Sequence, residues 1–401
     1  MCRLCRWNIS SQKNNPLVLR ISIFLMAVVA VSCSDREKPI RGFLLEEFPP
    51  IPPVEGKLVQ PGLAGPVAGV CGDYLLVAGG ANFEEEMPWR GGAKSYHDEI
   101  FLFRLEGDGD FVWTQAAESL PFPMAYPACL SFDRGVLCIG GENAEGPVSD
   151  VFLFSADSGK VTITRFPSLP MAITSPGAAL IGKKVYVAGG LDSAGAVDHF
   201  LVLQLDEEAT RWQSLPPLPV AMSHSVVVAR SDGSETCIYV LGGRNKTTEV
   251  HTFFSDIWKF KPSSATWTRE GEIAPDGKPL ALSAGTGIAA GKNQIVLFGG
   301  DPGIWFNRTE KLNNAITVAE DSLKQRLLQE KDTLLSNHPG FTRDVLVFNT
   351  VNKNWIKIGE AEEGFPATTT AFFWNDLVII PSGEIRPGVR TPQITALKFQ
   401  E

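Results

Sequence analysis

The chain has 401 residues, of which 44% are hydrophobic and 20% are charged. A chain of this length can bury a large core, either as two or three ordinary domains or as one large repeat domain. Its formal net charge of −9 at pH 7 predicts an acidic surface that repels phosphate backbones, which argues against nucleic acid as a partner.

The first residues have the pattern of an export signal. An apolar run of eleven residues, Ile21–Val31, follows a leader that has no acidic residue and whose cations are Arg3, Arg6, Lys13 and Arg20. Such a run is too short to span a bilayer and is typical of the core of a signal peptide. We therefore predict a signal peptide at residues 1–32 and a linker at 33–39, and the length of the leader leaves the true start codon open. Removal of residues 1–32 takes away four positive charges and no negative ones, so the formal net charge changes from −9 to −13.

The stretch AVSCSDREKP after the apolar run resembles the cleavage box of bacterial lipoproteins. Cys33 would then be the lipidated first residue and Ser32 the small residue before the cut, although Ala30 stands where Leu is usual. The resemblance implies an exported bacterial lipoprotein of the periplasm or outer membrane, anchored to the membrane through a lipid on Cys33. A soluble periplasmic protein is the alternative.

The cysteines that follow Cys33 do not indicate a metal site. They form no CxxC pair and no Cys/His spacing suited to zinc, and they are Cys71, Cys129, Cys138 and Cys237. Cys129 and Cys138 could face each other across a hairpin, but we favour two buried small apolar residues.

A repeat runs along the chain. Five apolar strands end in paired glycines roughly 50–60 residues apart, at Gly79–Gly80, Gly140–Gly141, Gly189–Gly190, Gly242–Gly243 and Gly299–Gly300. A sixth copy, LVIIPSG, keeps only Gly383 of the pair. Each copy continues with a short strand that has alternating bulky residues, and in four copies with a strand centred on Trp113, Trp212, Trp267 or Trp355. This pattern predicts an all-β fold, a kelch-type β-propeller with six blades of four strands each, at residues 40–401.

The two ends of the chain are predicted to share the last blade. The sixth copy ends after its third strand, whereas RGFLLEEFPPIPPVEG, at residues 41–56, has the form of a fourth strand with its proline-rich exit. An N-terminal strand in this position would close the ring and remove an open sheet edge.

One segment departs from the repeat. Between Gly300 and the next strand, apolar residues recur at three- and four-residue steps, as expected for a helix face; they are Leu312, Ile316, Ala319, Leu323 and Leu327. We predict a helical insertion at about residues 309–338, in the fifth blade. The sequence leaves open whether it is a lid over a site or padding of one blade.

Residues that follow the glycine pairs are expected to converge at one mouth of the central channel. The polar residues predicted to bind a ligand there are Asn82, Glu142, Arg244, Asn245, Asp301 and Glu384. Such a funnel suits a small, polar and anionic ligand. The first of these loops also carries Met87, Trp89, Arg90, Tyr96 and His97, which could stack on a sugar ring, although packing within the loop is the better interpretation for each.

Two stretches carry a specific resemblance: GLAGPVAGVCGDYLLVAGGANFEEEMPWRGGAKSYHDEI and PSGEIRPGVRT. They are similar to the sialate mutarotase family, the N-acetylneuraminate epimerases, in the branch called cyclically permuted mutarotases. The resemblance covers residues 56–399 and implies a six-bladed kelch propeller that interconverts the α and β anomers of sialic acid. It places the proposed catalytic pair on Glu384 and Arg390. Here the blade order is permuted, and Ser382 stands where the family has Asn or Gly.

Mutarotation opens a cyclic hemiketal and recloses it on the other face, which requires positioned acid–base groups and no metal or redox cofactor. We expect Glu384 to move the proton and Arg390 to bind the sugar carboxylate or to stabilise the developing oxyanion. Arg244 and Arg386 are further candidates for binding the carboxylate. For Arg386, a surface salt bridge is the preferred interpretation.

Two other functions stay open. A noncatalytic propeller that binds a sugar or a protein at the cell envelope would keep the funnel without needing Glu384. Copper chemistry would need His and Tyr ligands around one ion, whereas the five histidines, at positions 97, 199, 224, 251 and 338, are scattered over different repeats. His224 leads an inner strand and is interpreted as a cap of that strand. The particular acidic sugar and the oligomeric state, monomer or dimer, are not determined by the sequence.

Overall fold

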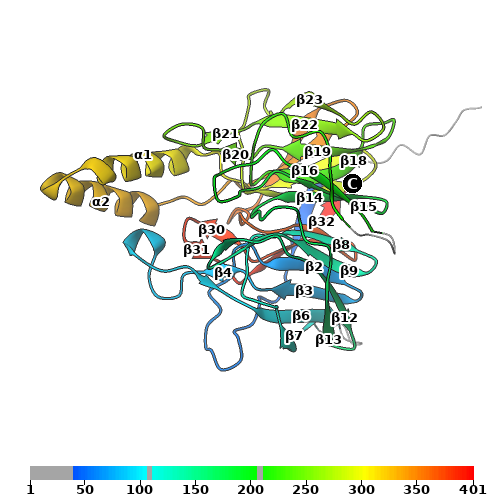
Figure 1. Ribbon diagram of the computed structural model, residues 1–401, viewed down its shortest axis with the longest axis horizontal. Coiled ribbons are helices and arrows are strands. Elements are labelled where there is room, and N and C mark those ends of the chain that lie inside the picture. Colours follow the sequence, from blue (N-terminus) through cyan, green and yellow to red (C-terminus); the bar gives the residue numbers. More distant parts are fainter. Residues whose placement is uncertain (1–38, 106–110, 206–210) are drawn as a thin grey trace, which may run out of the picture. The chain divides into compact units, whose positions relative to one another are not determined.

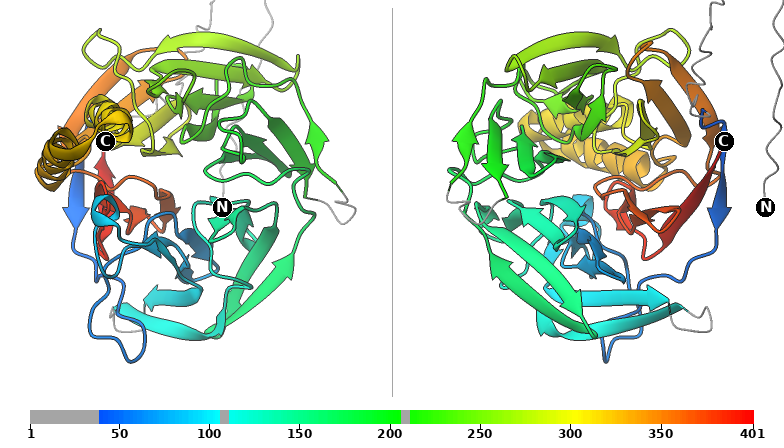
Figure 2. Two further views of the ribbon diagram at one scale, coloured as in Figure 1. Left: turned by 60° about the vertical axis from the view of Figure 1, so that its left-hand side comes forward. Right: turned by 90° about the vertical axis from the view of Figure 1, so that its right-hand side faces the viewer.

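A computed structural model describes residues 39–105, 111–205 and 211–401. Within these residues the longer strands form six four-stranded antiparallel sheets, which Figures 1 and 2 show arranged around a common axis in chain order. The predicted six-bladed β-propeller is therefore confirmed. The predicted signal peptide and Cys33 lie outside the described residues.

The blades follow one another along the chain. Blade 1 comprises β2 (Val67–Cys71), β3 (Tyr74–Ala78), β6 (Glu99–Leu105) and β7 (Phe111–Ser119); blade 2 comprises β8 (Ala128–Phe132), β9 (Gly135–Ile139), β12 (Val151–Asp157) and β13 (Lys160–Arg165); blade 3 comprises β14 (Gly177–Ile181), β15 (Lys184–Ala188), β16 (Phe200–Gln204) and β17 (Gln213–Ser214). Blade 4 comprises β18 (Val226–Ser231), β19 (Thr236–Leu241), β22 (Asp256–Lys261) and β23 (Thr266–Glu272); blade 5 comprises β24 (Thr286–Ala290), β25 (Gln294–Phe298), β26 (Asp344–Asn349) and β27 (Trp355–Glu360); blade 6 comprises β28 (Phe372–Trp374), β29 (Leu377–Pro381), β32 (Ile394–Gln400) and β1 (Gly42–Glu46).

Short hairpins and helices leave the blades after the second strands. The hairpins are β4 (Ala81–Asn82) with β5 (Ser95–Tyr96), β10 (Glu142–Asn143) with β11 (Gly146–Pro147), β20 (Arg244–Asn245) with β21 (Thr252–Phe253) and β30 (Glu384–Arg386) with β31 (Val389–Arg390). The helices are the 3-10 turn η1 (Pro88–Arg90), α1 (Ile304–Val318) and α2 (Asp321–Ser336). Figure 1 shows β4, β20, β21, β30, β31 and the two α-helices on the same side of the propeller. We call this side the mouth.

The core lies between neighbouring blades. Second strands such as YLLVA in β3 and GVLCI in β9 are buried along their whole length. They are apolar on both faces because each sheet packs against a sheet on either side: Leu76 of blade 1 and Phe154 of blade 2, for example, belong to one buried cluster. Burial of a side chain of this size contributes about 1.5–3 kcal/mol.

The N-terminal strand closes the ring, as predicted. β1 pairs antiparallel with β32, from Gly42 opposite Gln400 to Glu46 opposite Ala396, and Figure 2 shows the two strands side by side. The proline-rich exit after β1 also takes the expected place, because the Trp113 indole donates to the carbonyl oxygen of Pro49 (3.2 Å). The same bond recurs between other blades, from Trp212 to Pro167 (2.9 Å) and from Trp267 to Pro216 (2.9 Å).

A closed ring of six backbone hydrogen bonds joins the blades at the mouth. One residue just before each inner strand adopts a left-handed conformation with φ of 51–61°; these residues are Gly65, Tyr126, Ser175, His224, Ala284 and Thr368. Each donates its N–H to the carbonyl of the equivalent residue in the preceding blade, over 2.7–3.3 Å, and Gly65 donates to Thr368 to complete the circle. We call these residues the inner ring.

Backbone conformation explains why the sixth copy keeps only one glycine of the pair. The first residue has φ of 58–64° in the five Gly-Gly copies and 55° at Ser382, which lies in the left-handed region that other residues can enter. The second has φ of 92–112°, and Gly383 is among these at 109°. Only glycine adopts that conformation without strain.

The predicted helical insertion is present in blade 5, but it is divided between two helices. α1 and α2 are separated by Ala319–Glu320 and contact each other as a hairpin. The apolar repeat that we assigned to a helix face is thus split between them: Leu312 is buried, whereas Leu323 is 51% exposed. No helix in the described part of the chain is both long and apolar enough to cross a membrane.

The four cysteines of the described residues are buried and free. Cys129 and Cys138 are cross-strand partners in the β8–β9 hairpin, as the sequence suggested. Burial raises the pKa of the Cys129 thiol to about 12.

Candidate functional site

Six equivalent positions surround the mouth. The residue after each glycine pair forms a β-bridge to the residue that precedes the inner ring, and these residues are Ala81, Glu142, Leu191, Arg244, Asp301 and Glu384. The expected convergence is therefore present, and four of its six members are charged. We call this set the outer ring.

Glu384 and Arg390 are cross-strand partners in the β30–β31 hairpin. Arg390 Nη1 lies 3.2 Å from Glu384 Oε1, and the Gly388 N–H donates to the same carboxylate oxygen (2.8 Å). The Glu384 side chain is 18% exposed, whereas that of Arg390 is 4% exposed. A tight turn rich in Gly and Pro thus aligns a partly accessible carboxylate with a buried guanidinium.

The Arg390 guanidinium has further aromatic neighbours. It lies over the Phe83 ring, with Cζ 4.7 Å from the centroid. Its buried Nε and Nη1 have no well-aligned hydrogen-bond acceptor among the described residues. The Tyr126 side chain is close by: burial raises the pKa of its hydroxyl, the charge of Glu384 acts in the same direction, and Lys94 and Arg390 act in the opposite one.

A second charged pair occupies the blade 2 position of the outer ring. Glu142 Oε1 accepts hydrogen bonds from Lys94 Nζ (3.0 Å) and from the Tyr96 hydroxyl (2.6 Å). Lys94 Nζ also lies 5.0 Å from the centroid of the Tyr126 ring. Burial, followed by the bond to Glu142, raises the pKa of Tyr96 to about 12. The negative charge of Glu142 is therefore balanced within the protein by Lys94.

Arg244 stands at the blade 4 position and has a different environment. Its Nη2 donates to Nε2 of His224 (3.2 Å), and Nδ1 of His224 lies 2.9 Å from the Ser223 hydroxyl. The guanidinium carbon lies 4.8 Å from the centroid of Phe306 and 5.8 Å from that of Phe253. Burial lowers the pKa of Arg244 and, together with the charge of Arg244, holds the pKa of His224 well below its usual range.

Asp301, the blade 5 member, is 6% exposed. Its Oδ1 accepts the N–H of Gly303 (2.8 Å) just before α1 begins. Burial raises the pKa of Asp301, and the charge of Glu384 acts in the same direction while that of Arg244 lowers it. The charges of Asp301, Arg244 and Glu384, at the outer-ring positions of blades 5, 4 and 6, thus act on one another.

Three other predicted residues lie in the hairpins that follow the glycine pairs. Asn82 is 1% exposed; its amide donates to the carbonyl of Gly62 (3.1 Å), and its oxygen lies 2.9 Å from His97 Nε2. Asn245 is half-buried in the β20–β21 hairpin, opposite Thr252. Arg386 is the exposed last residue of β30, opposite Val389.

The aromatic loop of blade 1 is fastened to the helical insertion. The indole of Trp89 donates to Asp332 Oδ1 of α2 (2.9 Å), and Arg90 donates to the same carboxylate through Nε (2.6 Å) and Nη2 (3.2 Å). A Cβ on Gly388 would lie 2.9 Å from Trp89 Cζ3, so the loop also rests on the turn that carries Glu384.

Sequence reasoning missed several residues of the mouth: Lys94, Tyr126, His224 as a partner of Arg244, and Phe306. For Tyr126 and His224 a signal exists. Both stand at the inner-ring position, two residues before a strand, in the stretches MAYPACL and AMSHSVVV. An alignment of the six copies at this point would have identified a second ring of residues facing the channel.

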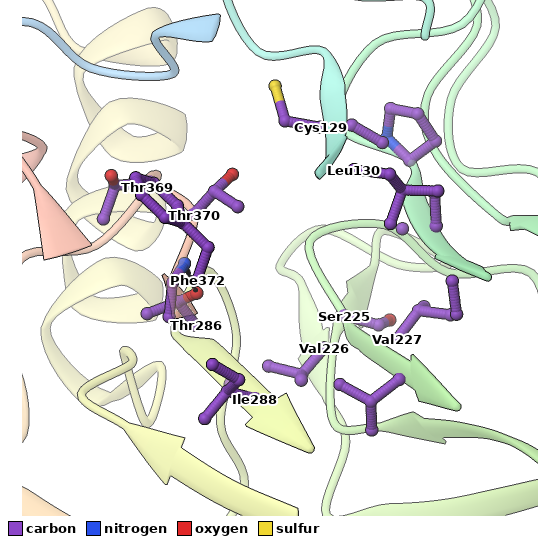
Figure 3. Close-up of a pocket in the computed structure, with 18 of the residues that line it drawn as sticks. Cys129, Leu130, Ser225, Val226, Val227, Thr286, Ile288, Thr369, Thr370 and Phe372 are labelled. Atoms are coloured by element: carbon purple, nitrogen blue, oxygen red, sulfur yellow. Dashed lines mark hydrogen bonds between the residues drawn. The ribbon is translucent and has the colours of Figure 1, made fainter. Parts of the chain in front are cut away.

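A central cavity of about 480 Å³ begins at the inner ring, and it is lined by the first strands of blades 2–6 and by Gly65 and Pro66 of blade 1. Its wall is mainly aliphatic, as in Val226, Val227 and Ile288, with hydroxyls from residues such as Ser225 and Thr370; Figure 3 shows these side chains around the space. The charged groups of the site are therefore gathered at the mouth, above an apolar channel.

The chain is similar to known proteins in sequence. The sequence model of a family described as N-acetylneuraminate epimerase matches residues 41–163 and 166–401. An N-acetylneuraminate epimerase of Salmonella paratyphi B is 24% identical over 159 residues, which cover 39% of this chain and 40% of that protein. Proteins of the same name from Brucella melitensis and Vibrio vulnificus are 37% and 35% identical over 123 residues, each covering 28% of this chain. The matched segments span 30–40% of the length of these relatives.

Proposed function

The chain belongs to the N-acetylneuraminate epimerase family, and from this premise we propose that it interconverts the α and β anomers of N-acetylneuraminate. The observation that carries the proposal is the Glu384–Arg390 pair at the mouth, in which a partly exposed carboxylate lies 3.2 Å from a buried guanidinium. The names of the relatives support an acidic sugar as the substrate.

The reaction needs proton transfer at two oxygens. One group removes the proton from the anomeric hydroxyl, and the ring oxygen is protonated as its bond to the anomeric carbon breaks; closure on the other face reverses these steps. Glu384 is the group that moves the proton, because the guanidinium of Arg390 stays protonated and cannot act as a base. Arg390 binds the sugar carboxylate or stabilises the negative charge that develops on oxygen.

The size of the expected rate effect is modest. General acid–base groups typically supply about 10²–10⁴-fold, which corresponds to roughly 3–5 kcal/mol of barrier. Because mutarotation also proceeds in water, a positioned carboxylate beside a fixed positive charge is sufficient for an effect of this size.

Anomer-resolved NMR of sialic acid freshly released as the α anomer tests the proposal. The parent protein should accelerate the appearance of the β anomer, whereas folded and monodisperse Glu384→Gln and Arg390→Ala variants should lose about 10²-fold or more of the added rate. Variants as fast as the parent would refute the assignment of these residues. A parent protein that does not change the spontaneous rate would refute the activity and favour a noncatalytic sugar-binding propeller.

A further inference from the structure

Among the charged members of the outer ring, Arg244 alone has neither an ion pair within 4 Å nor a backbone N–H group that it caps. Glu384 is paired with Arg390, Glu142 with Lys94, and Asp301 caps the N–H of Gly303. Within the described residues Arg244 forms no ion pair, and its hydrogen-bonded side-chain partner is the imidazole of His224. The carboxylates of Asp301, Glu384 and Glu310 act on Arg244 from beyond ion-pair distance. A partly buried cation without a paired carboxylate is costly, and a bound anion would supply that partner.

The guanidinium is nevertheless held firmly. His224 accepts from Nη2, so its Nε2 carries no proton and its Nδ1–H is directed at the Ser223 hydroxyl. Phe306 of α1 covers one side of the guanidinium at 4.8 Å. A neutral acceptor and an aromatic ring fix the orientation of the group without cancelling its charge.

The helical insertion supplies this support. Phe306 contacts Phe253 at 5.5 Å and His251 at 5.0 Å, both on the blade 4 loop. One turn further along α1, Glu310 accepts from the backbone N–H of His251 (2.7 Å) and from Lys246 Nζ (2.9 Å). α1 is thus bound to the loop that carries Arg244. Lys246 of that loop balances the negative charge of Glu310.

We propose that Arg244, held between His224 and Phe306 of the helical insertion, binds the carboxylate of the substrate, which leaves Arg390 to stabilise the oxygen at the reacting carbon. The proposal rests on the proposed function for the identity of the sugar. The planar fork of a guanidinium can bind both oxygens of a carboxylate.

Arg390 is the less suitable carboxylate site for two reasons. Its charge is already balanced by Glu384 at 3.2 Å, and a second carboxylate placed there would repel the first. Its side chain is also 4% exposed, whereas Arg244 retains an accessible surface at the mouth. Arg244 and Glu384 are both members of the outer ring, so a sugar whose carboxylate is bound by Arg244 would lie at the same mouth as Glu384.

The test compares N-acetylneuraminate with its uncharged methyl ester. Saturation-transfer NMR measures the exchange between the anomers at equilibrium and gives kcat/KM for both sugars. We expect the parent protein to prefer the acid by about 10- to 100-fold, the range for hydrogen bonds to a charged group. Arg244→Gln should bring this ratio close to one by slowing the acid, while Arg390→Gln should slow both sugars and keep the ratio. Arg134→Gln is the matched control, because Arg134 also lies over a phenylalanine ring, that of Phe166 (5.5 Å), in the β8–β9 turn away from the mouth.

Two further measurements keep the test decisive. If Arg244→Gln does not fold, Phe306→Leu and Arg244→Lys take its place, and each should lower the ratio by a smaller factor. Ligand-observed NMR titrations with the acid and the ester measure binding without turnover. One outcome is that the protein binds the acid more tightly than the ester, loses this preference in Arg244→Gln, and yet does not catalyse mutarotation. That result would uphold this proposal and refute the proposed function. Mutarotation with equal use of both sugars, or an unchanged ratio in Arg244→Gln, would overturn the proposal and leave the function standing.

Discussion

The carboxylate of Glu384 and the guanidinium of Arg390 face each other across a two-stranded hairpin, 3.2 Å apart, at the end of an otherwise apolar lead-in. The hairpin fixes the carboxylate through the Gly388 N–H, and Phe83 of blade 1 covers the guanidinium. The geometry of the pair therefore depends on contacts from two different blades.

Arg390→Lys should reduce kcat by about 10-fold or more with little change in thermal stability. Lysine keeps the positive charge but loses the planar fork and the stacking on Phe83. Arg165→Lys is the matched control, because Arg165 is likewise ion-paired with an acid, Asp150 (2.7 Å), and stacked on a phenylalanine, but on β13. A lysine variant with parental kcat in the anomer-exchange assay would show that charge alone suffices at this position.

Ser382 fastens the turn that carries Glu384 and Arg390 to the rest of the ring. It is fully buried, its hydroxyl accepts the N–H of Leu63 (2.8 Å) and it donates to the carbonyl of Thr391 (2.7 Å). Ser382→Ala should lower the free energy of unfolding by about 2–3 kcal/mol, because the buried N–H of Leu63 loses its partner. Ser382→Gly should cost about 1 kcal/mol less, since glycine relieves the left-handed backbone conformation. Chemical denaturation measures both, and an alanine variant as stable as the parent would contradict this role.

The sequence predicts the ring well because each blade repeats the same local requirements. The second glycine of each pair needs a φ that only glycine tolerates, and Trp113, Trp212 and Trp267 each need a carbonyl of the preceding proline-rich exit. Such requirements place the same residue types at regular intervals in the sequence. Even the closure of blade 6 by residues far apart in the chain can therefore be inferred.

The residues that make contacts at the mouth do not recur in this way along the sequence. His224 and Arg244 are partners across one blade, while Trp89 and Asp332 come from loops of blades 1 and 5 that are 243 residues apart. These loops differ in length and residues from copy to copy, and their mutual positions are set by the assembled ring. The sequence consequently identifies which positions reach the mouth but not how their side chains pair.

Asp332 determines how the blade 1 loop is held over the turn that carries Glu384. Asp332→Ala should increase amide hydrogen exchange in residues 83–94 and lower kcat/KM several-fold, because Trp89 and Arg90 both lose their partner on α2. Asp332→Asn should have a smaller effect, since its carbonyl can still accept from Trp89. Glu330→Ala is the control on the same helix, where the residue forms an exposed ion pair with Arg308 (3.6 Å). Unchanged exchange in residues 83–94 of Asp332→Ala would show that the loop is held by other contacts.

His338, at the end of the helical insertion, makes stability depend on pH. It is buried beside Trp305 and Phe341, and its Nδ1 accepts the N–H of Gly340 (3.1 Å). Burial, aided by the charge of Arg386, lowers the pKa of His338 to about 4.

The unfolded chain takes up a proton on this histidine near pH 6.5, whereas the folded protein does so only near pH 4. The stability that the neutral imidazole contributes is therefore fully present above about pH 6.5 and is lost as the pH falls toward about 4, with a slope of up to about 1.4 kcal/mol per pH unit. His338→Gln should flatten the pH dependence of the free energy of unfolding between these values. Arg386→Gln should reduce the total loss, because removal of a nearby positive charge raises the folded-state pKa of His338. Denaturation series at pH 4–7.5 measure these slopes, and a slope in His338→Gln equal to that of the parent would assign the pH dependence to other groups, such as His224.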